Sequence, residues 1–121
     1  MTEIEYLELE DIITMIRMLG IGPVRDIGLL DSAVNRPRSS AFGEDAYATL
    51  NLKAAALLQS IIKNPAIVDG NKRLAWLSTV VLCDLNDLSP QLTDDEAFQL
   101  AYDIASSQLD VDVIADRLHL E

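Results

Sequence analysis

The sequence predicts an all-α fold, a single compact domain over residues 1–121 built as a bundle of about six helices. Three observations lead to this prediction. Apolar residues recur at helical spacing in every apolar segment, and glycines and prolines fall between these segments. No segment shows the strict alternation or the glycine-rich hairpin turns of a β-sheet. A chain of 121 residues, half of them apolar, fits one domain with one hydrophobic core.

Two helices are expected in the first part of the chain. The segment from Leu7 to Gly20 has apolar residues at helical spacing, acids in its first turn and a glycine at its end. A turn rich in glycine and proline follows. The segment from Ile27 to Val34 has an apolar stripe and ends before Pro37, because the residue before a proline avoids helical geometry.

The segment from Arg36 to Ala48 combines Pro, Gly and Ser with two aromatic residues and has no period. We therefore expect a surface loop without regular structure. Thr49 then caps a helix from Leu50 to Lys63. Apolar residues occur on more than one face of this helix, which predicts that it is the central, buried one.

The apolar pattern breaks at residues 64–70, where Pro65 and Gly70 favour a loop. Farther on, Thr93 and Glu96 have the spacing of a capping box, in which each side chain bonds the other residue's backbone N–H. These signals place the remaining helices at about residues 71–85, 94–106 and 110–120.

Charge and apolar content limit the function classes. Twenty acidic and nine basic residues give a net charge of −11, which repels nucleic-acid phosphate, so we expect no direct binding to DNA. The longest uncharged apolar stretch, Leu74 to Cys83, is far shorter than the ~20 residues of a membrane span. The N-terminus carries acids where a secretory signal carries bases, so we expect a cytoplasmic protein with no membrane partner. Burial is expected for Cys83, the only cysteine.

The segment Asp69-Gly70-Asn71-Lys72-Arg73 stands where a buried helix begins. Unpaired N–H groups and the helix dipole make a helix N-terminus a ready anion site, and two basic side chains add positive charge there. Gly70 lets the backbone approach a phosphate closely, and Asp69 can hold a Mg²⁺ ion that neutralises phosphate oxygens. The alternative is structural: Asp or Asn before a helix is a common N-cap, and the basic residues are then simply solvated.

This segment resembles the signature of the Fic/Doc (death-on-curing) family, His-x-Phe-x-Asp/Glu-Gly/Ala-Asn-x-Arg, which lies between two central helices. Residues 69–73 match its second half position by position, and Lys72 between Asn71 and Arg73 is typical of the Doc branch. Trp76 stands where the longer Fic motif has a final Arg, which also fits the Doc branch. With weaker likeness elsewhere, the resemblance covers about residues 7–118.

The resemblance implies ATP and Mg²⁺ as cofactors. Asp69 is then the catalytic Mg²⁺ ligand, Gly70 and Asn71 belong to an anion hole, and Lys72 and Arg73 bind the nucleotide phosphates. Fic enzymes with glycine in place of Lys72 transfer AMP to a hydroxyl. The Doc branch instead transfers the γ-phosphate to translation elongation factor Tu, and its usual partner is an antitoxin protein. The family's target-docking flap corresponds to a short segment that includes Phe42, Gly43, Glu44, Asp45 and Tyr47.

The first half of the signature departs from the family. The Phe position is Ile67, and the position of the catalytic His is Pro65. Such a His accepts the proton of the target hydroxyl, which contributes roughly 10²- to 10⁴-fold in rate, and proline has no titratable group. The only histidine, His119, is two residues from the C-terminus. It replaces the missing base only if the fold brings it to the loop.

Four functions follow as alternatives. The chain is a Doc-type toxin whose phosphate site persists while transfer is lost, or it is an interaction module in which the loop only caps a helix. An AMP transferase of the Fic type is a third reading, and Lys72 argues against it. In the fourth, an active enzyme uses Glu44 or Asp45 as its base.

Overall fold

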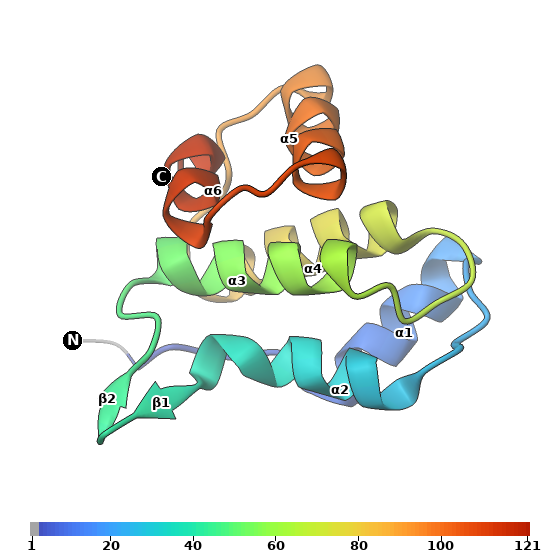
Figure 1. Ribbon diagram of the computed structural model, residues 1–121, viewed down its shortest axis with the longest axis horizontal. Coiled ribbons are helices and arrows are strands. Elements are labelled where there is room, and N and C mark those ends of the chain that lie inside the picture. Colours follow the sequence, from blue (N-terminus) through green and yellow to red (C-terminus); the bar gives the residue numbers. More distant parts are fainter. Residues whose placement is uncertain (1–2) are drawn as a thin grey trace.

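The computed structural model describes residues 3–121, and its architecture is the predicted helical bundle (Figure 1). A short 3₁₀ helix, η1 (Arg36–Arg38), and two two-residue strands, β1 (Ser40–Ala41) and β2 (Glu44–Asp45), lie between the second and third α-helices. The six α-helices are α1 (Leu9–Leu19), α2 (Ile27–Asn35), α3 (Leu50–Lys63), α4 (Asn71–Leu85), α5 (Asp94–Ser106) and α6 (Val111–Leu118). The all-α prediction is confirmed.

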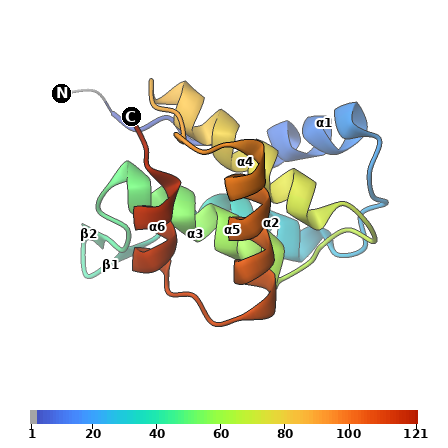
Figure 2. The ribbon, with the colours of Figure 1, turned by 90° about the horizontal axis from the view of Figure 1, so that it is seen from above.

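The helices form three layers, with α3 and α4 between the pair α1 and α2 on one side and the pair α5 and α6 on the other (Figures 1 and 2). α3 packs against α2, α4, α5 and α6, and it is buried on most of its faces as its sequence predicts. Leu58, Leu74 and Ile114, from α3, α4 and α6, are fully buried in one shared core. None of the helices within residues 3–121 has the length and apolarity needed to cross a membrane.

Helix ends follow the predicted caps, with small shifts. Thr49 accepts a hydrogen bond from the Leu52 N–H at the start of α3, and Thr93 and Glu96 form the capping box of α5. α1 begins two residues later than expected, at Leu9, because Glu8 serves as its N-cap. α6 is shorter than expected and ends at Leu118.

The segment over residues 36–48, expected to lack regular structure, contains a short antiparallel hairpin, so that prediction is wrong. Ser40 pairs with Asp45 and Ala41 with Glu44. The two turn residues between the strands, Phe42 and Gly43, both have positive φ, 54° and 80°. A two-residue turn of this kind matches the twist of a hairpin, and its usual signal is Asn-Gly. Because the first turn position holds phenylalanine instead of asparagine, the sequence did not predict this turn.

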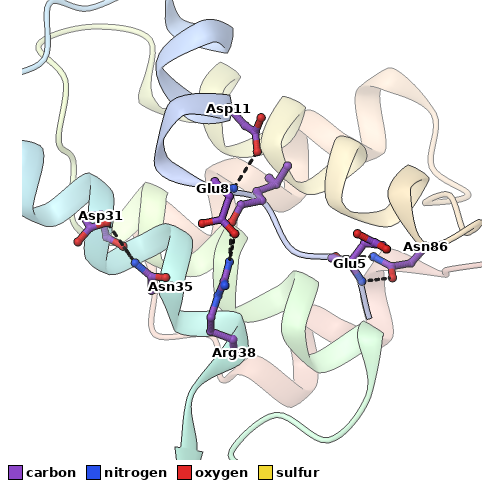
Figure 3. Close-up of polar contacts among 8 residues, drawn as sticks. Glu5, Glu8, Asp11, Asp31, Asn35, Arg38 and Asn86 are labelled. Atoms are coloured by element: carbon purple, nitrogen blue, oxygen red, sulfur yellow. Dashed lines mark hydrogen bonds and ion pairs between the residues drawn. The ribbon is translucent and has the colours of Figure 1, made fainter. Parts of the chain in front are cut away.

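Polar contacts fix the N-terminal segment across the bundle (Figure 3). The Asn86 side chain, just after α4, bonds both the N–H and the carbonyl of Glu5, each at 2.9 Å. Arg38 donates to a Glu8 carboxylate oxygen at 3.2 Å and to the carbonyl of Leu7 at 2.8 Å. These contacts join α1, η1 and the end of α4, away from the loop between α3 and α4.

Candidate phosphate-binding site

The loop over residues 64–70 joins the two most buried helices at one end of the bundle (Figure 1). Gly70, the N-cap of α4, has a φ of 99°. A Cβ at this position would lie 2.7 Å from the Cβ of Ile21, closer than side chains tolerate. Only glycine satisfies both this backbone conformation and this close approach, so the chain needs Gly70 to form the loop.

The Asn71 side chain holds the loop in shape. Its Nδ2 donates to the carbonyl of Ile67 at 2.8 Å, and its Oδ1 accepts from the Ile67 N–H at 3.2 Å. Because its Oδ1 and one of its two amide hydrogens are used within the protein, Asn71 can offer an anion its backbone N–H and the second amide hydrogen.

Five consecutive backbone N–H groups, those of residues 69–73, have no acceptor within residues 3–121. The first N–H of α4 with a partner belongs to Leu74, which donates to the carbonyl of Gly70 at 2.9 Å. The Asp69 side chain makes no capping hydrogen bond, so Asp69 does not cap this helix as the structural alternative expected. Unpaired N–H groups beside a residue with left-handed φ, at the positive end of a helix dipole, form an anion-binding concavity.

A hollow of about 250 Å³ is lined by residues 68–73, which include the residues that carry these N–H groups. The Lys72 and Arg73 side chains are exposed, and neither has an ion pair or a hydrogen-bond acceptor within residues 3–121. The structure therefore brings Asp69, Gly70, Asn71, Lys72 and Arg73 together around one cavity. The arrangement joins backbone donors and two full positive charges, as phosphate binding requires.

Asp69 is exposed at the edge of this hollow. No group of three or more His, Cys, Asp or Glu side chains in the described part of the chain is placed to hold a metal ion. Mg²⁺ is commonly held by one or two carboxylates together with substrate phosphates. Asp69 alone could therefore supply one carboxylate ligand to a Mg²⁺ ion, and the other ligands would have to come from outside the protein side chains of residues 3–121.

Pro65 lies exposed in the loop, and its carbonyl accepts a hydrogen bond from Arg25 at 3.0 Å. His119 does not approach it. That residue ends α6, where its carbonyl accepts from the Gln91 N–H at 3.0 Å, beside the pairing of Pro90 with Leu120. The C-terminus and the loop lie at opposite sides of the molecule (Figures 1 and 2), so His119 does not replace the base.

The predicted flap does not meet the loop in this structure. α3, about 20 Å long, separates the hairpin at its N-terminal end from the loop at its C-terminal end (Figures 1 and 2). The Phe42 side chain is fully exposed at the hairpin tip. Asp45 pairs with Lys53 at 3.2 Å and Tyr47 accepts from Arg36 at 2.8 Å, so both serve the packing of the hairpin. Glu44 and Asp45 are therefore too far away to act as a base at the loop.

Comparison with known proteins agrees with the loop geometry. The sequence model of the Fic/DOC family matches residues 2–83, two thirds of the chain, including the whole loop. The chain is also similar to the protein named Toxin Doc of Mycolicibacterium smegmatis (strain ATCC 700084 / mc(2)155). The two are 45% identical over 118 residues, which covers 94% of this chain and 91% of that protein. This chain belongs to the Fic/DOC family.

Two features of this Fic/DOC chain were missed by sequence reasoning. One is the segment over residues 22–26, whose backbone pairs with the loop. The other is an apolar groove of about 510 Å³ between α4 and α5, which shares Lys72 and Arg73 with the phosphate hollow. Its apolar lining comes from Leu19, Trp76, Leu77, Val80, Ala97, Phe98 and Ala101. Phe98, which lines this groove, is 70% exposed. The sequence of α5 alone did not predict that this side chain would be exposed.

Proposed function

We propose that this chain is a Doc-type toxin of a toxin–antitoxin pair whose loop binds the phosphates of ATP, and that it no longer transfers phosphate. The observation that carries the proposal is the row of five unpaired N–H groups with Lys72 and Arg73 around one hollow. Membership of the Fic/DOC family and the 45% identity to a protein named Toxin Doc support it.

Phosphate binding follows from the chemistry of the hollow. The N–H groups of residues 69–73 donate to phosphate oxygens without prior rearrangement, because no protein group in residues 3–121 competes for them. Lys72 and Arg73 supply positive charge in a chain whose net charge is −11, so the hollow is the place where an anion is favoured. When bound with the nucleotide, Mg²⁺ neutralises phosphate oxygens, and Asp69 is the residue that would hold it.

Transfer of the γ-phosphate to a hydroxyl of elongation factor Tu is the activity that the Doc branch implies. The reaction needs a group that accepts the hydroxyl proton, and Pro65 occupies the position of the family's His. Neither His119 nor the hairpin carboxylates reach the loop. The chain therefore keeps the phosphate site without the base.

The antitoxin partner has a candidate surface in the apolar groove between α4 and α5. A groove of this size, lined by aliphatic and aromatic side chains, suits the apolar face of a helical segment. Lys72, Arg73 and Asp94 also line it, so an acidic residue of that segment placed beside the two basic side chains would complement that part of the groove. We assign the groove to a helical segment of the antitoxin.

The test is a calorimetric titration of ATP with Mg²⁺ into the chain, with Pro65→His assayed in parallel for phosphate transfer to elongation factor Tu. We expect binding by both proteins and transfer only by the variant. Lys72→Ala should weaken binding roughly tenfold, because it removes a charge-assisted contact of about 1.4 kcal/mol. Arg117→Ala, which removes one positive charge from α6 together with its ion pair to Asp103, serves as the control and should bind ATP like the parent.

Each other outcome identifies a different function. Absence of nucleotide binding in both proteins overturns the proposal and leaves an interaction module that uses the groove. Transfer of AMP rather than phosphate by Pro65→His would assign the Fic type of chemistry. Phosphate transfer by the unchanged chain would show that a base other than the motif His operates.

A further inference from the structure

The segment over residues 22–26, between α1 and α2, lies alongside the phosphate loop (Figure 1). Val24 and Ile67 pair in antiparallel fashion. The Gly22 N–H donates to the carbonyl of Asp69 at 3.1 Å, and the Val68 N–H donates to the carbonyl of Pro23 at 3.0 Å. The loop is therefore one side of a short two-stranded ladder.

This ladder determines which backbone groups of the loop remain available. The carbonyl of Ala66 accepts from the N–H groups of Arg25 and Asp26, at 2.7 and 3.0 Å, and that of Ile67 accepts from the Asn71 side chain. With Asp69 bonded to Gly22, the carbonyls of residues 65–67, 69 and 70 are bound to protein donors, while the N–H groups of residues 69–73 have no acceptor within residues 3–121. The N–H groups thus remain available to an anion, whereas most of the loop carbonyls are already engaged.

Arg25 gives the one side-chain hydrogen bond from this segment to the loop within residues 3–121. Its Nη2 donates to the carbonyl of Pro65 at 3.0 Å. Pro65 lies two residues after the last residue of α3, and its carbonyl is outside the helical hydrogen-bond pattern, so Arg25 supplies the donor that this carbonyl would otherwise take from water. The backbone N–H of Arg25 bonds the next carbonyl, that of Ala66. One residue therefore holds two successive carbonyls at the start of the loop.

We propose that Arg25 is a positioning residue of the phosphate loop, which it holds by its guanidinium contact to the Pro65 carbonyl. The expected effect on nucleotide binding rests on the proposed function. The expected effect on the order of the loop rests on the hydrogen bonds alone. Arg25 touches no phosphate in this role. It acts through the backbone that carries the donors.

Two measurements test the proposal in Arg25→Ala, Arg25→Gln and the parent. The first is amide hydrogen exchange at Gly22, Ile67 and Val68, which reports local opening of the ladder without any ligand. Loss of one hydrogen bond to a carbonyl should raise exchange at these amides roughly three- to tenfold in Arg25→Ala. Arg25→Gln, which keeps a donor without the charge, should restore most of the protection.

The second measurement is the dissociation constant for ATP with Mg²⁺, which should rise by a similar factor in Arg25→Ala. Lys63→Ala is the matched control, because Lys63 also donates one side-chain hydrogen bond to a carbonyl, that of Ser107, at 3.1 Å. It should change neither measurement at the loop.

Unchanged exchange in Arg25→Ala overturns the positioning role. Faster exchange in Arg25→Ala, together with no binding of ATP by the parent chain, supports the positioning role and overturns the proposed function instead, so the two failures are distinguishable.

Discussion

Basic side chains around the hairpin differ from those at the phosphate loop in how they are used. Arg36 donates to Tyr47, Ala56, Gln59 and Ser60 at 2.8 to 3.2 Å. Near it, Arg38 and Lys53 lie over the ring of Tyr6, and the buried Lys53 ammonium bonds the carbonyl of Pro37 and the carboxylate of Asp45. Lys72 and Arg73, at the loop, have no such partner in the described residues. Arginine and lysine side chains thus stabilise the fold around the hairpin, whereas Lys72 and Arg73 at the loop remain free for a ligand.

The largest expected effect compares one arginine from each region. Arg36→Ala should lower the free energy of unfolding by about 3 kcal/mol, because it leaves several part-buried acceptors without their donor. Arg73→Ala should change it by less than about 0.5 kcal/mol, as is usual for an exposed, unpartnered side chain. Urea denaturation of both variants measures the difference. Equal destabilisation would remove the distinction between the two regions.

The next effect concerns backbone conformation in the loop. Gly70→Ala should lower the free energy of unfolding by about 2 kcal/mol, because a side chain at a φ of 99° is strained and its Cβ would collide with Ile21. Gly20→Ala is the matched control: Gly20 has a φ of 65°, and a Cβ there meets nothing within 4 Å. It should cost only about 1 kcal/mol. If the two variants were equally stable, the contact with Ile21 would have no energetic role.

The sequence predicted the helices and the loop because their signals are local. Thr49, Thr93 and Gly70 mark helix ends through their own side chains or dihedral freedom, and the residues of the loop motif are consecutive. Contacts between distant segments carry no such signal. The bond from Arg25 to Pro65, 40 residues apart, and the groove between α4 and α5 depend on how the helices pack.

For the hairpin, the sequence identified the segment but did not predict its position relative to the loop. Its residues resembled a flap that meets the phosphate loop, and the local likeness was enough to name Phe42, Gly43, Glu44, Asp45 and Tyr47. The packing of η1 against α3 decides where the hairpin lies, through contacts of Arg36 with residues 20 to 24 positions away. A segment can therefore be identified from its sequence while its place relative to the site is not.

The smallest expected effect is a difference between Lys53 and Lys72 in how they contribute to the pH dependence of stability. Burial opposes the charge on Lys53, but its interactions with Tyr6 and Asp45 outweigh burial and raise the pKa of the ammonium above its ordinary value of 10.5. A pKa raised by folding gives stability that is complete below the unfolded value and is lost as the pH rises through the folded value. The chain should therefore lose stability in urea as the pH rises past 10.5.

Lys53→Met should flatten this alkaline loss of stability, since the variant keeps much of the buried volume and has no proton to release there. Lys72→Met should leave the loss as it is in the parent, because the Lys72 ammonium is exposed and contacts no acid within residues 3–121. An alkaline profile of Lys53→Met that coincides with the parent would show that the Lys53 ammonium, although buried and bonded at both Pro37 and Asp45, does not hold the hairpin to α3. The comparison between engaged and free basic residues would then rest on the arginines alone.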